Sequence, residues 1–242
     1  MELTRRGILT GAAVGAVGTL ITTGSASAVT FADPVGPGKT TLTADQALAK
    51  LRAGNRRYVA DIPVKADMSR ARRLALAKGQ GPFAALIGCS DSRVGPEQLF
   101  GAGLGELFIV RTAGNYVDQA GLGSVEYAVG VLGVSLIVVM GHERCGAVSA
   151  AVDVITKNAQ FPGSIGNMLE PILPAVVQAQ ARLGPGGDLV EASVRANVAR
   201  VAGRLRTASE PLLLDPIKAG RVKVVGATYD LDSGAVDFFD GA

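Results

Sequence analysis

The sequence has one histidine, two cysteines and no tryptophan among its 242 residues. Aromatic residues make up only 5% of the chain, which leaves no evident platform for stacking single-stranded nucleic acid. The net charge is only +3, and no run of five lysines or arginines occurs, so we expect no nucleic-acid partner. Beyond the N-terminal region, no apolar run is long enough for a membrane helix, so we expect no membrane span in the mature chain.

The N-terminal region has the features of an export signal. Arg5 and Arg6 precede a glycine-rich apolar stretch that ends at Ala26-Ser27-Ala28, a typical cleavage pattern. The paired arginines are typical of the twin-arginine route. We therefore predict a signal peptide at residues 1–28 and a protein exported to the periplasm, the cell envelope or the medium. A linker at residues 29–42 would follow, and then one globular domain at residues 43–242.

The hydrophobic pattern of that domain predicts an α/β fold. Short apolar runs predict buried strands at residues 82–88, 106–111 and 134–140. Longer patterns between and around them predict helices, at residues 43–59, 68–78, 123–133, 147–156 and over much of 165–219. The alternation predicts a mostly parallel central β-sheet flanked by helices. Residues 222–239 predict a C-terminal hairpin or edge strand with its turn at 232–234.

The scarce histidine and cysteines lie in two short stretches. Cys89 follows one predicted strand, and His142 follows another, with Cys145 three residues later. In a parallel sheet, residues at the carboxyl ends of strands meet at one edge. Two thiolates and one imidazole form a zinc-type ligand set that leaves a fourth position open. A Cys89–Cys145 disulfide in an exported protein is the alternative, and the residue pattern alone leaves both interpretations open.

The amino-acid sequences of these two stretches resemble those of the β-class carbonic anhydrases. The motifs "CSDSRV" and "GHERCG" carry the resemblance, together with "GELFIVRTAGN", "GSVEYAVGVLG" and the terminal "VVGATYDLDSGAVDF". The similarity extends over residues 42–239, in the order and spacing of that family. It implies the family's fold, an enzyme that reversibly hydrates carbon dioxide to bicarbonate and a proton, and one Zn²⁺ per chain. It also implies a homodimer or tetramer whose active-site pocket forms at the subunit interface.

The resemblance assigns roles to individual positions. The zinc ligands would be Cys89, His142 and Cys145, and zinc-bound hydroxide would attack CO2. Asp91 and Arg93 would form the catalytic pair. Asp91 lies close enough in sequence to reach the metal itself, and Arg93 would hold it away and leave it to orient the hydroxide. The substrate pocket would include Gln80, Phe108 and Tyr127.

The sequence alone leaves two alternative functions open. Relatives of the family include hydrolases of carbon disulfide or carbonyl sulfide, which would use the same site with different pocket access. A non-enzymatic redox or bicarbonate-sensing protein would instead contain the Cys89–Cys145 disulfide. Metal content and the state of the two thiols distinguish this last alternative from a zinc enzyme.

Overall fold

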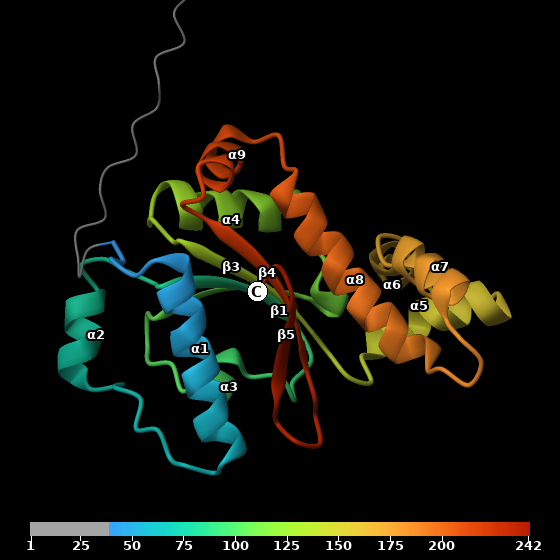
Figure 1. The fold of residues 1–242 in the computed structure, drawn as a ribbon, viewed down its shortest axis with the longest axis horizontal. Coiled ribbons are helices and arrows are strands. Elements are labelled where there is room, and N and C mark those ends of the chain that lie inside the picture. Colours follow the sequence, from blue (N-terminus) through green and yellow to red (C-terminus); the bar gives the residue numbers. More distant parts are fainter. Residues whose placement is uncertain (1–38) are drawn as a thin grey trace, which may run out of the picture. The chain divides into compact units, whose positions relative to one another are not determined.

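The computed structural model describes residues 39–242, in which five strands form one sheet in the order β2-β1-β3-β4-β5. The first four strands along the chain pair in parallel, and β5 runs antiparallel to β4 (Figure 1). The strands are β1 (Ala84–Cys89), β2 (Leu107–Thr112), β3 (Leu136–His142), β4 (Lys223–Tyr229) and β5 (Val236–Asp240). The predicted mostly parallel sheet with a C-terminal hairpin is therefore confirmed.

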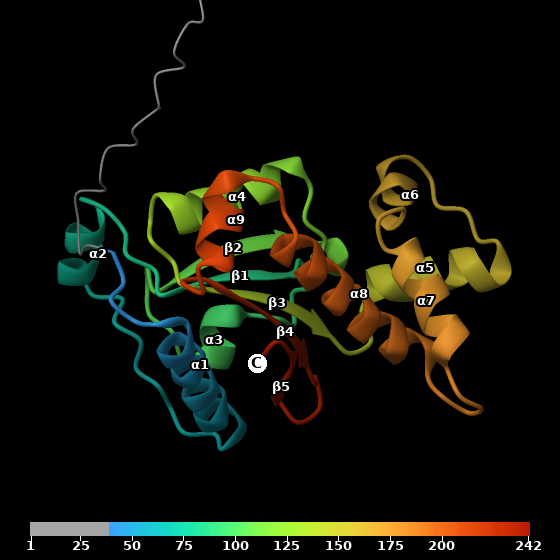
Figure 2. The same cartoon turned by 45° about the horizontal axis from the view of Figure 1, so that its top comes forward.

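Helices cover both faces of this sheet. Figure 2 shows α1 and α3 on one side and α4 and α9 on the other. The helices are α1 (Ala44–Val59), α2 (Arg70–Leu76), α3 (Pro96–Phe100), α4 (Gln119–Gly130), α5 (Gly146–Lys157), α6 (Ser164–Leu169), α7 (Leu173–Arg182), α8 (Leu189–Arg206) and α9 (Pro211–Lys218), with a short 3-10 turn, η1, at Ala113–Asn115. No helix within residues 39–242 is both long and apolar enough to cross a membrane.

Alternation along the central strands divides the core into two layers. In β1, Ala85 and Ile87 pack with α4 and α8, whereas Ala84 and Leu86 face the layer that contains α1 and α3. All six residues of β1 are buried. This pattern follows from the two-residue repeat of a strand that is covered on both faces, and it explains the continuous apolar runs in the sequence.

A third apolar cluster lies where the sheet meets a lobe of helices. Figures 1 and 2 both show α5, α6 and α7 gathered at one end of the sheet, beside α8. This cluster includes Cys89 and Cys145, together with Val148, Ile172 and Val194. The two cysteines are therefore part of a packed core between the strand ends and the helical lobe.

Some element boundaries differ from those expected. Cys89 and His142 are the last residues of β1 and β3, not the residues that follow them, because β1 continues its pairing to Thr112 and β3 to Tyr229. The helical pattern over 165–219 is broken into four helices. The helix α3 has only five residues, too few to show a helical period of its own. The predicted signal peptide and most of the predicted linker lie outside the described residues.

Candidate metal centre

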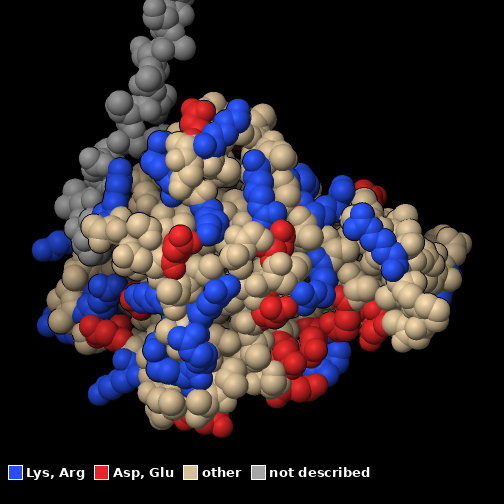
Figure 3. Space-filling model, in the orientation of Figure 1, with Lys and Arg blue, Asp and Glu red and all other residues tan. Residues whose placement is uncertain are grey.

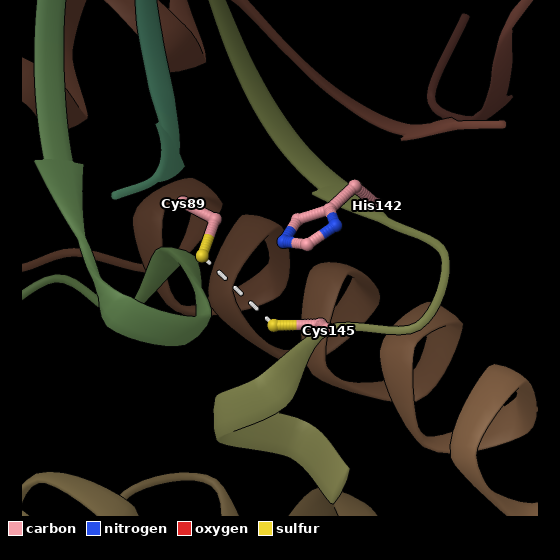
Figure 4. A group of neighbouring side chains, drawn as sticks. All are labelled: Cys89, His142 and Cys145. Carbon is pink, nitrogen blue, oxygen red and sulfur yellow. Dashed lines mark hydrogen bonds between the residues drawn. The ribbon is translucent and has the colours of Figure 1, made fainter. Parts of the chain in front are cut away.

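The fold brings the histidine and both cysteines together. β1 and β3 are adjacent parallel strands, so their carboxyl ends place Cys89 and His142 side by side. Cys145 is the N-cap residue of α5, directly after the turn that follows β3. One ligand atom from each of the three residues lies within 4.8 Å of the other two. Figure 4 shows one ring nitrogen of His142 facing the sulfur atoms.

The imidazole of His142 is oriented for metal binding. Its Nδ1 lies 2.9 Å from the carbonyl oxygen of Glu143, and because a carbonyl can only accept, Nδ1 carries the proton and donates it. Nε2 then presents a lone pair. That atom is buried and has no hydrogen-bond partner among residues 39–242. A buried, unpaired nitrogen beside two sulfurs fits a metal ion, and the Nδ1–carbonyl bond is the usual support of a ligating histidine.

The two thiols lie in hydrogen-bond contact. Their sulfur atoms lie 3.9 Å apart and form no disulfide, contrary to the disulfide interpretation of the sequence. The hydrogen bond from Cys145 lowers the pKa of Cys89 to about 4, and the N–H of Gly114, 3.4 Å from the Cys89 sulfur, acts in the same direction. The same hydrogen bond, together with burial, raises the pKa of Cys145. A divalent cation at this position would favour the thiolate form of both cysteines.

Asp91 and Arg93 form a bidentate ion pair beside this group. Arg93 donates from Nε to Oδ1 at 2.9 Å and from Nη2 to Oδ2 at 2.7 Å, and its backbone N–H reaches Oδ1 at 3.0 Å. The same Oδ2 lies 3.8 Å from Nε2 of His142. The carboxylate of Asp91 is thus within reach of a metal ion held by the three ligands, while Arg93 occupies both of its oxygens.

Arg111 also holds this loop, and the sequence analysis missed it. Its Nε donates to the carbonyl of Cys89 at 2.8 Å, and its Nη2 donates to the carbonyl of Asp91 at 2.7 Å. Arg111 lies in β2, opposite Gly88 of β1. In the sequence, Arg111 was visible only as a charged residue at the end of a predicted apolar strand. The pairing of β2 with β1 is what brings it next to the loop that follows Cys89.

The predicted pocket residues lie away from the metal group within one chain. Phe108 pairs with Ala85, four residues before Cys89, or about 13 Å along the strand. Its ring is 6.3 Å from that of Tyr127, centroid to centroid. Gln80 is exposed in the segment that precedes β1, near the opposite end of the strand from Cys89. The role of these three residues in a substrate pocket therefore stays a prediction.

Comparison with known proteins defines the class. The carbonic anhydrase family profile matches residues 84–236. The chain is 42% identical over 185 residues to carbonic anhydrase 2 of Mycobacterium tuberculosis, covering 76% of this chain and 87% of that protein. It is 38% identical over 174 residues to a carbonic anhydrase of Pseudomonas aeruginosa, covering 69% of this chain and 78% of that one.

Solved structures agree with this assignment. The β-carbonic anhydrase CafA of Aspergillus fumigatus superposes with a TM-score of 0.61 at 29% identity, covering 82% of this chain and 91% of that chain. A tetrameric β-carbonic anhydrase of Sordaria macrospora superposes with a TM-score of 0.60 at 27% identity, covering 68% and 83%. The chain belongs to the β-class carbonic anhydrases.

The Asp91–Arg93 pair predicts a specific acid titration. Hydrogen bonding from Arg93 lowers the pKa of Asp91 below its ordinary 3.8. The pair therefore stabilises the fold above pH 3.8, and this stabilisation is lost as the pH falls through the lower folded pKa. In a carbon-detected NMR titration of the metal-free protein, we expect Asp91 to remain mostly ionised at pH 3.8, and Arg93→Gln to raise its midpoint toward that value. Equal midpoints in the two proteins would contradict this origin of the shift.

Proposed function

We propose that the chain binds one Zn²⁺ through Cys89, His142 and Cys145 and catalyses the reversible hydration of CO2 to bicarbonate and a proton. The observation that carries the proposal is the unpaired Nε2 of His142, buried beside two cysteine sulfur atoms that lie 3.9 Å apart. Sulfur and imidazole ligands suit zinc, and three protein ligands are typical of a catalytic zinc site, which keeps its fourth position open. Membership of the carbonic anhydrase family supports CO2 as the substrate.

The bound metal would supply a water molecule acidic enough to attack CO2 near neutral pH. The protein supplies orientation. Because Arg93 engages both oxygens of Asp91, the carboxylate is drawn away from the open metal position and keeps lone pairs free to accept a hydrogen bond from the attacking water. Arg111 holds the carbonyls on either side of Ser90, which limits movement of Asp91 relative to Cys89.

The burial of the site supports the same chemistry. His142 is fully buried, and Cys89 and Cys145 are 5% and 1% exposed. Charge interactions weaken less in such surroundings than in bulk water, so the metal, the thiolates and the carboxylate act on one another strongly. Neither carbon disulfide nor carbonyl sulfide is favoured by any feature of this site, and both are tested as substrates in the assay below.

Metal content and CO2 hydration test the proposal together. We expect the unreduced wild-type protein to contain one zinc ion per chain and to hydrate CO2 in a stopped-flow assay. Cys89→Ser should lose the metal and the activity, because one of three ligands becomes a poor one. Asp91→Asn should retain zinc but lose activity by about a hundredfold or more. The neutral amide has one acceptor oxygen where the charged carboxylate has two, so it accepts the hydrogen bond of the attacking water less well.

Asp153→Asn is the matched control, because Asp153 is a carboxylate on α5 whose ion pair is with Lys157. Its zinc content and activity should equal those of the wild type. A metal-free wild-type protein with a Cys89–Cys145 disulfide would support the redox alternative. A zinc protein that hydrolyses carbon disulfide or carbonyl sulfide and leaves CO2 unchanged would contradict the assignment of the substrate.

We also propose that the active unit is a homodimer or a tetramer built from dimers. None of the seven residues of α2 is buried within the chain, and Leu74 is 55% exposed. β2 is an edge strand whose apolar side chains are only partly covered. A second copy packed against these surfaces would bury them and would bring its own Gln80, Phe108 and Tyr127 toward the neighbouring site. The tetrameric relative from Sordaria macrospora supports assembly.

Light scattering of the full chain tests the assembly. We expect a mass of two or four chains, and we expect Leu74→Asp to weaken association by about tenfold or more, because a charge is placed in an apolar interface. Val177→Asp is the control, since Val177 is 52% exposed on α7 in the helical lobe. A monomeric wild type, or equal dissociation of the two variants, would contradict the proposed interface.

Export is a third part of the proposal. Arg5, Arg6 and the Ala26-Ser27-Ala28 sequence support transport by the twin-arginine route and cleavage after Ala28. N-terminal sequencing of the protein recovered outside the cytoplasm should therefore begin at Val29. Replacement of both arginines by lysine should leave the uncleaved chain in the cytoplasm. Recovery of the uncleaved wild type from the cytoplasm alone would contradict export.

A further inference from the structure

The turn between two of the proposed ligands has an unusual conformation at Arg144. This residue lies between His142 and Cys145, and its φ is +49°, in the left-handed region that non-glycine residues rarely adopt. A residue held in this region needs surrounding contacts that fix it there. The contacts around Arg144 come from three separate parts of the chain.

The C-terminal hairpin supplies the first of these contacts. The guanidinium of Arg144 forms a bidentate pair with Asp232, with distances of 2.7 and 2.8 Å. The neighbouring Glu143 is tied to the same hairpin, because its N–H donates to the carbonyl of Tyr229 at 3.0 Å and its carboxylate accepts from the N–H of Leu231 at 3.3 Å. The turn that follows β3 is thus attached to the turn that joins β4 and β5.

The other two contacts involve the backbone of Arg144. Its N–H donates to the carboxylate of Glu191, in the first turn of α8, at 2.7 Å. Its carbonyl oxygen lies 3.4 Å from Nη2 of Arg93, the same nitrogen that donates to Oδ2 of Asp91. Arg144 therefore connects the hairpin and α8 to the catalytic ion pair through its own backbone.

The carboxylates gathered near the turn have a cation among them, because the side chain of Arg144 lies between them. Glu143, Asp230 and Asp232 place oxygen atoms within 4.8 Å of one another, and Figure 3 shows acidic side chains gathered between the C-terminal hairpin and the nearby part of α8. The guanidinium of Arg144 lies 3.7 Å from Glu143 and 2.7 Å from Asp232. The carboxylates thus surround a cation that the chain itself supplies.

We propose that Arg144 is a positioning residue, held by Asp232 and Glu191, that fixes the His142–Cys145 turn in its metal-binding geometry and supports Arg93. The inference rests on the proposed function, since the geometry matters most when the site holds zinc. Outer residues that orient metal ligands typically alter metal affinity 10- to 100-fold when they are changed. We expect an effect near the lower end of that range, because Asp232 is largely exposed.

The zinc-loaded full chain tests this role through metal retention. In the presence of an excess of chelator, we expect Asp232→Asn to release zinc about tenfold faster than the wild type. The matched control is Asp237→Asn, which breaks the exposed Arg195–Asp237 pair at 2.9 Å on the same hairpin, away from the hydrogen bonds that hold the 142–145 turn. Wild-type release from Asp232→Asn, or equal acceleration by the two variants, would overturn the proposal.

Arg144→Gly separates positioning from backbone strain. Glycine adopts a positive φ at no steric cost, so a role limited to strain predicts unchanged or slower zinc release and a higher melting temperature. Positioning through the side chain predicts faster release although the strain is removed. Arg144→Lys, which keeps the charge but not the bidentate geometry, should lie between the wild type and the glycine variant. Wild-type retention in the glycine variant would contradict the proposal.

Hydrogen exchange of the metal-free chain keeps this test independent of the proposed function. If the wild type bound no zinc, the proposed function would fail, whereas the hold of Asp232 on the 142–145 turn could still be measured at the amides of Arg144 and Cys145. We expect Asp232→Asn to speed exchange at these two amides and Asp237→Asn to leave them unchanged. Equal protection of the turn in all three proteins would overturn the inference whatever the metal content.

Discussion

The parallel pairing of β1 with β3 is the constraint on which the site depends. Because parallel strands end at the same edge, the pairing fixes the last residue of each strand, Cys89 and His142, next to one another. The chain then turns immediately into α5, and Cys145 completes the group. Burial of both strands on both faces makes this register costly to change, since a shift of one residue would move apolar side chains to the wrong layer. The three proposed metal ligands are therefore held by the packing of the core.

Arginine side chains set the environment around these ligands. Arg93 engages the carboxylate of Asp91, and Arg111 holds the carbonyls on either side of Ser90. Arg144 joins the His142–Cys145 turn to the C-terminal hairpin. Each has several donors in a fixed planar arrangement, which suits oxygen atoms at known positions better than a lysine would. A chain with one histidine thus builds its site from two sulfurs, one imidazole and a surrounding group of guanidinium contacts.

Much of this arrangement could be predicted from the sequence, and the reasons for the rest are physical. Continuous apolar runs revealed β1, β2 and β3, and strand adjacency then predicted that Cys89, His142 and Cys145 would meet. Contacts between distant segments left no local signal: Arg144 and Asp232 are 88 positions apart, and a left-handed arginine is stabilised only by its tertiary partners. Gln80 lies near the opposite end of β1 from Cys89, and its proposed role in the pocket depends on a second copy of the chain, which one sequence does not place.

X-ray absorption at the zinc edge of the unreduced, full-length protein tests the central claim most directly. The account predicts a first shell with two sulfur atoms at about 2.3 Å and one imidazole nitrogen at about 2.0–2.1 Å, with the remaining position filled by one lighter atom. Cys145→Ser, like Cys89→Ser, should leave the protein without zinc. A shell of oxygen and nitrogen atoms without sulfur, or zinc absent from a protein whose two cysteines are joined, would contradict the account.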